Sequence, residues 1–410
     1  MEERFRWMRE REEGGASLAE LCRKYGISRK TAYKWLRRYE EQGLVGLQDR
    51  ESPPHQPANK ISEEVERSLV ELRIGHRTWG PKKLLGWMER NRPGQSWPAL
   101  STIGLILSRN NLSSGKAARQ RCDVPKQPLA HATSPNDVWC IDFKGWFVCG
   151  DKKRCDPLTV TGAFSRYLFC CQAMERTDGP HTQKVMIELF RHNGLPDRIR
   201  SDNGTPFSAN GGLSVLSVWW LRLGILPERI DPGKPQQNGR HERMHRTLKQ
   251  ETAQPPADTI LQQQKRFDRF LEEYNRERPH EALQQSPPAD HYVRSQRRYP
   301  EQLPEMVYPD GFQVRIADQN GKIRWLKARC KLGTALANQA IGVQTVADGL
   351  NHLWFGRQLL GVLDERRHRS GAKKRINSYW PPLQSPSGLL TRQPEAGQTD
   401  AAILNKSGKV

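Results

Sequence analysis

Three acidic residues of this sequence stand in local contexts where a carboxylate could do chemistry. Asp142 follows Val138–Ile141, an apolar run that predicts a buried strand, where an ionised carboxylate is costly unless it is paired or binds a metal ion. Asp202 closes a second strand-like segment, 198–202, and precedes an Asn-Gly turn. Each has an ordinary alternative, because a carboxylate at a strand end is often solvated and Asp-Asn-Gly occurs in many turns.

The third acid, Glu242, lies in a segment that predicts a helix over 237–251. One face of that helix carries, at helical spacing, Glu242, His245, Arg246 and Lys249. A helix face with one acid among several bases is also typical of a solvated surface. The spacing alone therefore leaves both interpretations open.

The pattern around these acids predicts a mixed α/β layer fold. From Val138 short apolar or β-branched runs are separated by turn residues, and helices and strands then alternate. The predicted helices cover residues 180–192, 213–223, 237–251 and 258–275, and the later strands cover 198–202 and 226–230.

Residues 136–292 resemble the catalytic core of the retroviral-integrase superfamily, the ribonuclease H-like DDE enzymes, and especially the transposases of insertion sequences. The matching segments, in chain order, are Trp139–Phe143, Ser201–Phe207, Pro235–Lys249 and Tyr274–Tyr292. Their order is specific, although the interval from Asp202 to Glu242 is slightly longer than is usual in the family.

The resemblance implies metal-dependent phosphoryl transfer, with Asp142, Asp202 and Glu242 as catalytic residues and metal ligands. Transfer between diester oxygens needs charge neutralisation and in-line positioning more than a protein nucleophile, and two Mg²⁺ ions supply both. Mn²⁺ is expected to substitute. In this arrangement Asp142 bridges the two ions, Asp202 completes one site, and Glu242 completes the other.

The same resemblance implies DNA contacts from the helix that carries Glu242. Lys249 matches the position that grips the DNA end of the element, and Asn238 matches a position near the scissile DNA. Arg246 lies on the face of Lys249 and is expected to hold a phosphate.

Residues 1–50 predict a helix-turn-helix DNA-binding domain. A break at 26–28 separates an apolar-periodic helix from a basic one, and residues 17–39 resemble the DNA-binding heads of bacterial transposases and repressors. An ordinary helical hairpin is the alternative. The basic side chains expected to contact DNA are Arg29, Lys30, Lys34 and Arg37.

Residues 60–113 predict a second helix-turn-helix-like domain, with helices over 63–74, 81–91 and 101–110. The last of these helices has one basic side chain, so packing or dimerisation explains it about as well as base reading.

The fold class is therefore multi-domain, with N-terminal all-α helix-turn-helix units, a central α/β ribonuclease H-like integrase core and a C-terminal small β barrel. The core covers residues 135–292, and short β-like runs separated by turn signals predict the barrel over 300–368. A proline-rich linker over 48–60 and a basic linker over 114–134 join the domains. The tail, 369–410, has few apolar anchors and is expected to be disordered.

The charge of the chain indicates a polyanionic partner. Lysine and arginine number 66 against 45 acidic residues, which gives a net charge of +21. We expect double-stranded DNA as the partner, both element ends and target, and a homo-oligomer on that DNA. No apolar run is long enough to span a membrane and the first residues are not a secretory signal, so a cytoplasmic, nucleoid-associated bacterial protein is expected. The eight cysteines form no CxxC pair and are expected to be buried free thiols.

Three functions compete. The first is an integrase-type DNA transposase that binds element ends and catalyses strand cleavage and transfer. The second is a transposase-derived DNA-binding regulator, which keeps the helix-turn-helix domains and has no need of the three acids. The third is a nuclease of ribonuclease H type, which has no helix-turn-helix domains. The presence of both the acids and the N-terminal domains favours the first.

Overall fold

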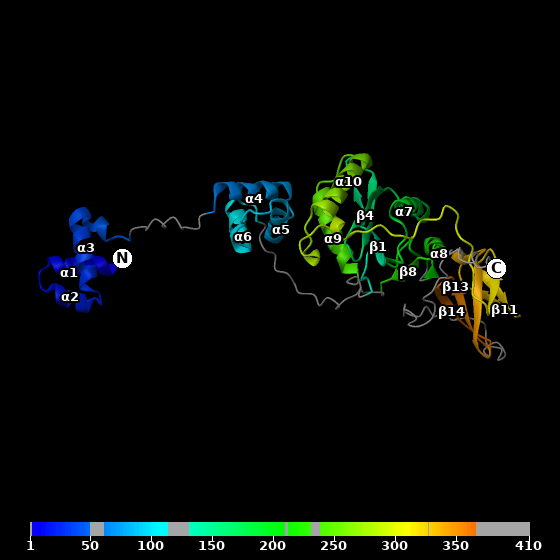
Figure 1. Cartoon of the computed structure of the whole chain (residues 1–410). Helices are drawn as coiled ribbons and strands as arrows, with labels where there is room; N and C mark the ends of the chain where they lie inside the picture. Colours follow the sequence, from blue (N-terminus) through cyan, green and yellow to red (C-terminus); the bar gives the residue numbers. More distant parts are fainter. Residues whose placement is uncertain are drawn as a thin grey trace, which may run out of the picture. The chain divides into compact units, whose positions relative to one another are not determined.

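The computed structural model describes residues 2–49, 61–113, 131–209, 212–230, 238–326 and 328–365. The chain forms two compact units, Met1–Glu63 and Glu64–Val410. Figure 1 shows their helices and strands. Most of the two predicted linkers and the whole predicted tail lie outside the described residues. In the part of the chain that is described, no helix combines the length and the apolarity needed to cross a membrane.

The first unit is a small three-helix domain. Its elements are α1 (Glu2–Glu12), α2 (Leu18–Lys24), α3 (Arg29–Gln42) and a 3₁₀ turn η1 (Gly43–Leu47). Ser17 and Glu20 form a reciprocal capping box at the start of α2, and the Ser28 hydroxyl accepts a hydrogen bond from the Thr31 amide at the start of α3. The helices enclose a core of Trp7, Met8, Leu21, Cys22, Ala32 and Leu47.

The second unit begins with another helical bundle. Its helices are α4 (Glu63–Gly75), α5 (Pro81–Asn91) and α6 (Leu100–Arg109). Pro81 occupies the first turn of α5, where its missing amide hydrogen costs nothing. The apolar stripes of the helices supply buried side chains, among them Leu69, Leu84, Met88, Ile103 and Ile106.

The α/β core follows, built on a mixed sheet. Its strands are β1 (Val138–Phe143), β2 (Phe147–Val148), β3 (Arg154–Gly162), β4 (Leu168–Met174), β5 (Arg198–Ser201) and β8 (Leu226–Arg229). The order is β2-β3-β1-β5-β8, with β4 also paired to β3. Strands β1 and β3 and strands β3 and β4 are antiparallel, whereas β5 runs parallel to β1 and β8 runs parallel to β5.

Helices cover both faces of this sheet (Figure 1). They are α7 (Gly179–Asn193), α8 (Val215–Arg222), α9 (Gly239–Thr252) and α10 (Ile260–Arg276). Side chains from α7 and α8 share one hydrophobic cluster with Trp139 and Ile141 of β1, while α9 and α10 pack on Leu168 and Cys171 of β4. Because strand side chains alternate between faces, Asp142 is expected on the face opposite Ile141, toward α9.

The helix predicted over 213–223 begins two residues later than expected. Leu213 pairs with Ser208 in the short hairpin of β6 (Ser208–Ala209) and β7 (Gly212–Leu213). Ser214 then caps α8 by accepting a hydrogen bond from the Ser217 amide.

The C-terminal region forms sheets, but the predicted closed barrel is not found within residues 312–326 and 328–365. Its strands are β9 (Phe312–Ile316), β10 (Lys322–Trp325), β11 (Ala328–Lys331), β12 (Ala340–Ala347), β13 (Leu350–Phe355) and β14 (Gln358–Asp364). Four of them pair in the order β14-β13-β12-β9, which leaves β14 and β9 as edges, and β10 and β11 form a separate hairpin. Ile323 and Trp325 of that hairpin join one cluster with Ile341, Leu353 and Leu221 of α8, so apolar surface is buried without closing the sheet.

The cysteines of the described residues are free and buried, as expected from their spacing: Cys22, Cys140, Cys149, Cys155, Cys170, Cys171 and Cys330. Cys122 lies outside the described residues.

Candidate active site

The register between β1 and β5 brings two of the predicted acids to one edge of the sheet. The strands are parallel, and Val138 pairs with Arg198 and Cys140 with Arg200. Continued by two residues, the same register sets Asp142 beside Asp202. Asp142 therefore lies near the carboxyl end of β1, and Asp202 directly follows the carboxyl end of the parallel strand β5.

The electrostatics of Asp142 link all three acids. Burial, together with the carboxylates of Asp202 and, more weakly, Glu242, raises the pKa of the Asp142 carboxyl to about 7, against a backbone hydrogen bond from Phe143 and the charge of Lys144. Like charges that disfavour ionisation at a buried carboxyl are relieved by a bound cation. Carboxylate oxygens are the ligands that hard divalent ions prefer.

The turn after β5 fixes the second acid. The Gly204 amide donates a hydrogen bond to Oδ1 of Asp202 over 3.1 Å. A Cβ atom at Gly204 would lie 3.0 Å from Oδ2 of the same carboxylate. Glycine therefore allows the backbone to approach the carboxylate closely enough to hold it.

Helix α9 supplies the third acid on the face that the sequence predicted. Met244 and Leu248 point into the core, while Glu242, Arg246 and Lys249 are exposed. A depression of about 380 Å³ is lined by Lys144, Glu242, His245, Arg246, Lys249, Gln250 and Gln254. The structure thus gathers Glu242, Arg246 and Lys249 at one hollow.

Asn238 lies immediately before α9 and is buried, with 5% of its surface exposed. Its side-chain oxygen has no hydrogen-bond partner among the described residues. A buried amide oxygen without a partner is costly, so this atom is suited to accept from a bound group.

Behind Asp142 lies a polar network that the sequence analysis did not single out. The Thr159 hydroxyl lies 3.1 Å from the main-chain oxygen of Asp142, 2.7 Å from Nε2 of His241 and 2.7 Å from Nε2 of His245. The Thr161 hydroxyl lies 2.8 Å from Nδ1 of His241. In the sequence, Thr159 and Thr161 alternate with Leu158 and Val160, and this alternation indicates a polar face of β3 opposite the apolar one.

Burial keeps both histidines of this network neutral. It lowers the pKa of His241 to about 3 and holds the pKa of His245 well below its usual range, helped by the nearby His241 and Lys144. His245 is also close to the first acid, with 3.9 Å between its Nδ1 and Oδ2 of Asp142.

The predicted DNA-contacting residues of the first unit share the exposed face of α3. Arg29, Lys30, Lys34 and Arg37 are all exposed. Tyr33 was not among the predicted residues. It lies between Lys30 and Lys34 in the sequence, and its side chain is 61% exposed. These side chains belong to a unit separate from the acids.

The segment Tyr274–Tyr292, matched from sequence to the end of the core, contacts the helical bundle α4–α6. Arg278 is buried, and its guanidinium lies 2.7 Å from a carboxylate oxygen of Glu251 and 3.2 Å from the Thr78 hydroxyl. A Cβ atom at Gly86 of α5 would lie 2.6 Å from Cβ of Gln285, so the two segments pack closely there.

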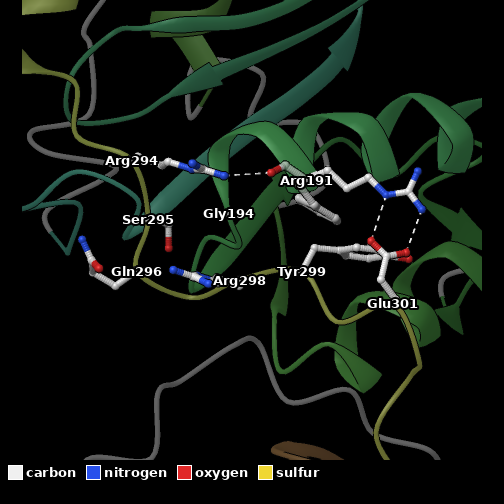
Figure 2. A pocket seen from close by; sticks show the side chains of 9 residues that line it. Arg191, Gly194, Arg294, Ser295, Gln296, Arg298, Tyr299 and Glu301 are labelled. Atoms are coloured by element: carbon white, nitrogen blue, oxygen red, sulfur yellow. Dashed lines mark hydrogen bonds and ion pairs between the residues drawn. The ribbon is translucent and has the colours of Figure 1, made fainter.

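A larger depression, of about 490 Å³, lies at the C-terminal end of α7 (Figure 2). Arg191 on one of its walls is paired with Glu301, and Arg294 donates to the main-chain oxygen of Arg191. Glu301 is the one carboxylate among the lining residues and is engaged in that pair. This depression therefore lacks the free acids of a metal site.

Four family models match parts of the chain. Residues 132–235 and residues 223–288 match two family models, each described as an integrase core domain. Residues 3–57 match a helix-turn-helix domain and residues 31–107 match a homeodomain-like domain.

Proteins of insertion elements are similar to the chain. It is 25% identical over 227 residues to the insertion element IS407 uncharacterized 31.7 kDa protein of Burkholderia multivorans, covering 54% of this chain and 78% of that protein. It is 25% identical over 286 residues to the insertion element IS476 uncharacterized 39.2 kDa protein of Xanthomonas euvesicatoria, covering 69% and 79%.

Among solved structures, the HTLV-2 integrase catalytic core domain in complex with magnesium is 14% identical and has a TM-score of 0.32, covering 39% of this chain and 99% of that one. The chain therefore contains an integrase core domain preceded by helix-turn-helix domains, and it is similar to proteins of insertion elements.

Proposed function

We propose that this protein cuts and joins DNA strands at the ends of its element, with Asp142, Asp202 and Glu242 as the catalytic metal ligands. The observation that carries the proposal is the meeting of two strand-end acids at one sheet edge, with the charge of Glu242 acting on the first of them. An arrangement that raises the cost of ionising a buried carboxyl is typical of a site built for a cation.

The residues of the site would divide the work. Two Mg²⁺ ions, or Mn²⁺ in their place, would supply activation of the attacking hydroxyl and charge neutralisation at the phosphate. Asp142, whose pKa is raised by the charges of both other acids, would bridge the ions, with Asp202 and Glu242 completing one site each. Lys249 and Arg246 would hold DNA phosphates beside Glu242.

Further groups would position the DNA. Asn238 offers an unsatisfied amide oxygen close in sequence to Glu242. The exposed basic face of α3, Arg29 to Arg37, would read the element ends in the major groove. The second helical bundle would act as a further DNA-binding or packing domain.

Two assembly expectations complete the proposal. Because an element has two ends that must reach one target, we expect a homo-oligomer on DNA. The net charge of +21 suits binding to the nucleoid.

A DNA-binding regulator without catalysis is the alternative. It would need only the helix-turn-helix domains. Such a protein has no need of Asp142 and Asp202 on neighbouring strands. In it, Asp142 would be a buried carboxyl that is costly to ionise and has no function.

The test is a joining assay with the full-length protein. Duplexes made from the DNA flanking the gene, end-labelled and mixed with plasmid, should give joined products with Mg²⁺ or Mn²⁺ and none with a chelator. Selective binding to those duplexes without joining under any divalent ion would favour the regulator.

A further inference from the structure

His245 lies beside Asp142 and lines the same hollow as Glu242, but it has no part in the proposed catalytic triad. Only 6% of its side chain is exposed. Its Nδ1 atom lies 3.9 Å from Oδ2 of Asp142, beyond hydrogen-bond distance. No hydrogen bond to Nδ1 is found within the described part of the chain.

The other ring nitrogen of His245 is committed. The Thr159 hydroxyl has one hydrogen, and the main-chain oxygen of Asp142, 3.1 Å away, is an acceptor only. With that hydrogen donated to Asp142, the Thr159 oxygen accepts from the Nε2–H of His245 over 2.7 Å. With the hydrogens placed in this way, His245 carries its proton on Nε2 and a lone pair on Nδ1.

A histidine that donates one ring N–H to a fixed acceptor and presents the other nitrogen beside a carboxylate has the arrangement of a metal ligand. Two atoms each about 2.1 Å from one ion lie about 3.0 to 4.2 Å apart, depending on the angle between the bonds. The separation of 3.9 Å between Nδ1 of His245 and Oδ2 of Asp142 falls within that range.

His241 differs from His245 in this respect. Asp142, His241 and His245 each offer a ligand atom, and these atoms lie within 4.8 Å of one another. Both ring nitrogens of His241, however, are engaged by the hydroxyls of Thr159 and Thr161. A metal bond to His241 would break one of these buried hydrogen bonds, which is costly.

We propose that His245 binds, through Nδ1, the same divalent ion as Asp142, so that one metal position has a mixed nitrogen and oxygen donor set. The inference rests on the proposed metal-binding role of Asp142 and extends it. An imidazole ligand suits transition metals better than it suits Mg²⁺, which prefers oxygen. The position should therefore favour Mn²⁺ over Mg²⁺, and His245→Asn should lower Mn²⁺ affinity by on the order of 10-fold or more.

The experiment is pulsed electron paramagnetic resonance on the full-length protein loaded with Mn²⁺, without DNA. A directly bound imidazole gives a ¹⁴N coupling. We expect this coupling in the wild-type protein, its loss in His245→Asn, and its retention in the matched variant His241→Asn. Absence of the coupling in the wild-type protein, or its persistence in His245→Asn, would overturn the inference and leave His245 as a residue that only packs behind Asp142.

Two controls keep the result decisive. If either variant fails to fold, wild-type protein labelled with ¹⁵N-histidine should show the coupling change to that of ¹⁵N, and His245→Gln replaces His245→Asn. Asp142→Asn separates the two proposals. If the wild-type protein binds Mn²⁺ without nitrogen coupling and Asp142→Asn loses that binding, the inference on His245 fails while the role of Asp142 stands.

Discussion

The basic face of α3 and the acidic edge of the α/β core, formed by Asp142 and Asp202, place their charges in opposite environments. On α3 the charged side chains stand in solvent, held by a helix whose other face packs through Ala32. At the acidic edge Asp142 is largely buried, and the sheet register, the Gly204 amide and the Thr159 hydroxyl hold the site from behind. A recognition surface needs side chains free to adapt to a partner, whereas a catalytic site needs charges fixed before the substrate arrives.

The first prediction separates the two regions most strongly. Asp142→Asn, Asp202→Asn and Glu242→Gln should each lower strand joining by on the order of 1,000-fold or more, because an amide cannot neutralise metal charge. Binding to element ends, measured by gel shift, should change little since α3 is untouched. A variant that joins ends at near the wild-type rate would remove its residue from the triad.

The second prediction tests the other side of the comparison. A fragment that begins at about Gln56 lacks α3 and should lose selectivity for element ends over unrelated DNA by on the order of 100-fold or more. Its thermal unfolding should resemble that of the second unit in the full chain. Equal selectivity of the fragment and the full-length protein would show that end recognition lies elsewhere.

The third prediction concerns Lys249. Its side chain is exposed and basic, like those of α3, but it lines the hollow that contains Glu242. Lys249→Glu should slow joining by about 10-fold and weaken end binding, because a like charge would face phosphate. Lys249→Arg should be much milder, since the charge survives.

Salt dependence identifies the cause of the Lys249 effect. A real phosphate contact contributes about one unit to the slope of log affinity against log salt, so Lys249→Glu should flatten that slope by this amount. Unchanged joining and slope would mean that Lys249 pairs only with solvent or with Glu242.

The fourth prediction is the smallest and uses no DNA. In the metal-free protein the pKa of Asp142 is raised to about 7, above its value of about 4 in an unfolded chain. The folded state therefore holds a proton that the unfolded chain releases, so this carboxyl makes the protein less stable as the pH rises from about 4 to about 7. Asp142→Asn should raise the free energy of unfolding at pH 8 by on the order of 2 kcal/mol, and by less at pH 5.

Denaturant unfolding with chelator at the two pH values checks this. Added Mg²⁺ should stabilise the wild-type protein at pH 8 and reduce the advantage of Asp142→Asn. A difference between the two proteins that does not vary with pH would contradict the burial of an ionisable Asp142.

The sequence predicted those parts of the site that depend on local pattern. Asp142 follows an apolar run, Asp202 closes a strand-like segment before an Asn-Gly turn, and the shared face of Glu242 and Lys249 follows from helical spacing. The contacts of Thr159 with His241 could not be predicted in this way, because they depend on how α9 packs against β3.

The C-terminal region shows the same limit for the fold. Its runs of β-branched and apolar residues identified strands, and strands did form. Closure is a different property, since it requires the two edge strands to meet in register. Here β9 and β14 remain edges, while the hairpin of β10 and β11 buries Ile323 and Trp325 against the sheet cluster.

The central claim, that the carboxylate of Asp142 is a working part of strand joining, is tested most directly by two matched substitutions in the same segment. Asp137 also lies in the β1 region, but its carboxylate accepts hydrogen bonds from the Thr133 and Ser134 amides, a structural role that an asparagine oxygen can largely keep. Joining of labelled element ends should be abolished in Asp142→Asn and stay within a few-fold of wild type in Asp137→Asn, with equal end binding by both. Equal joining by the two variants would contradict the account.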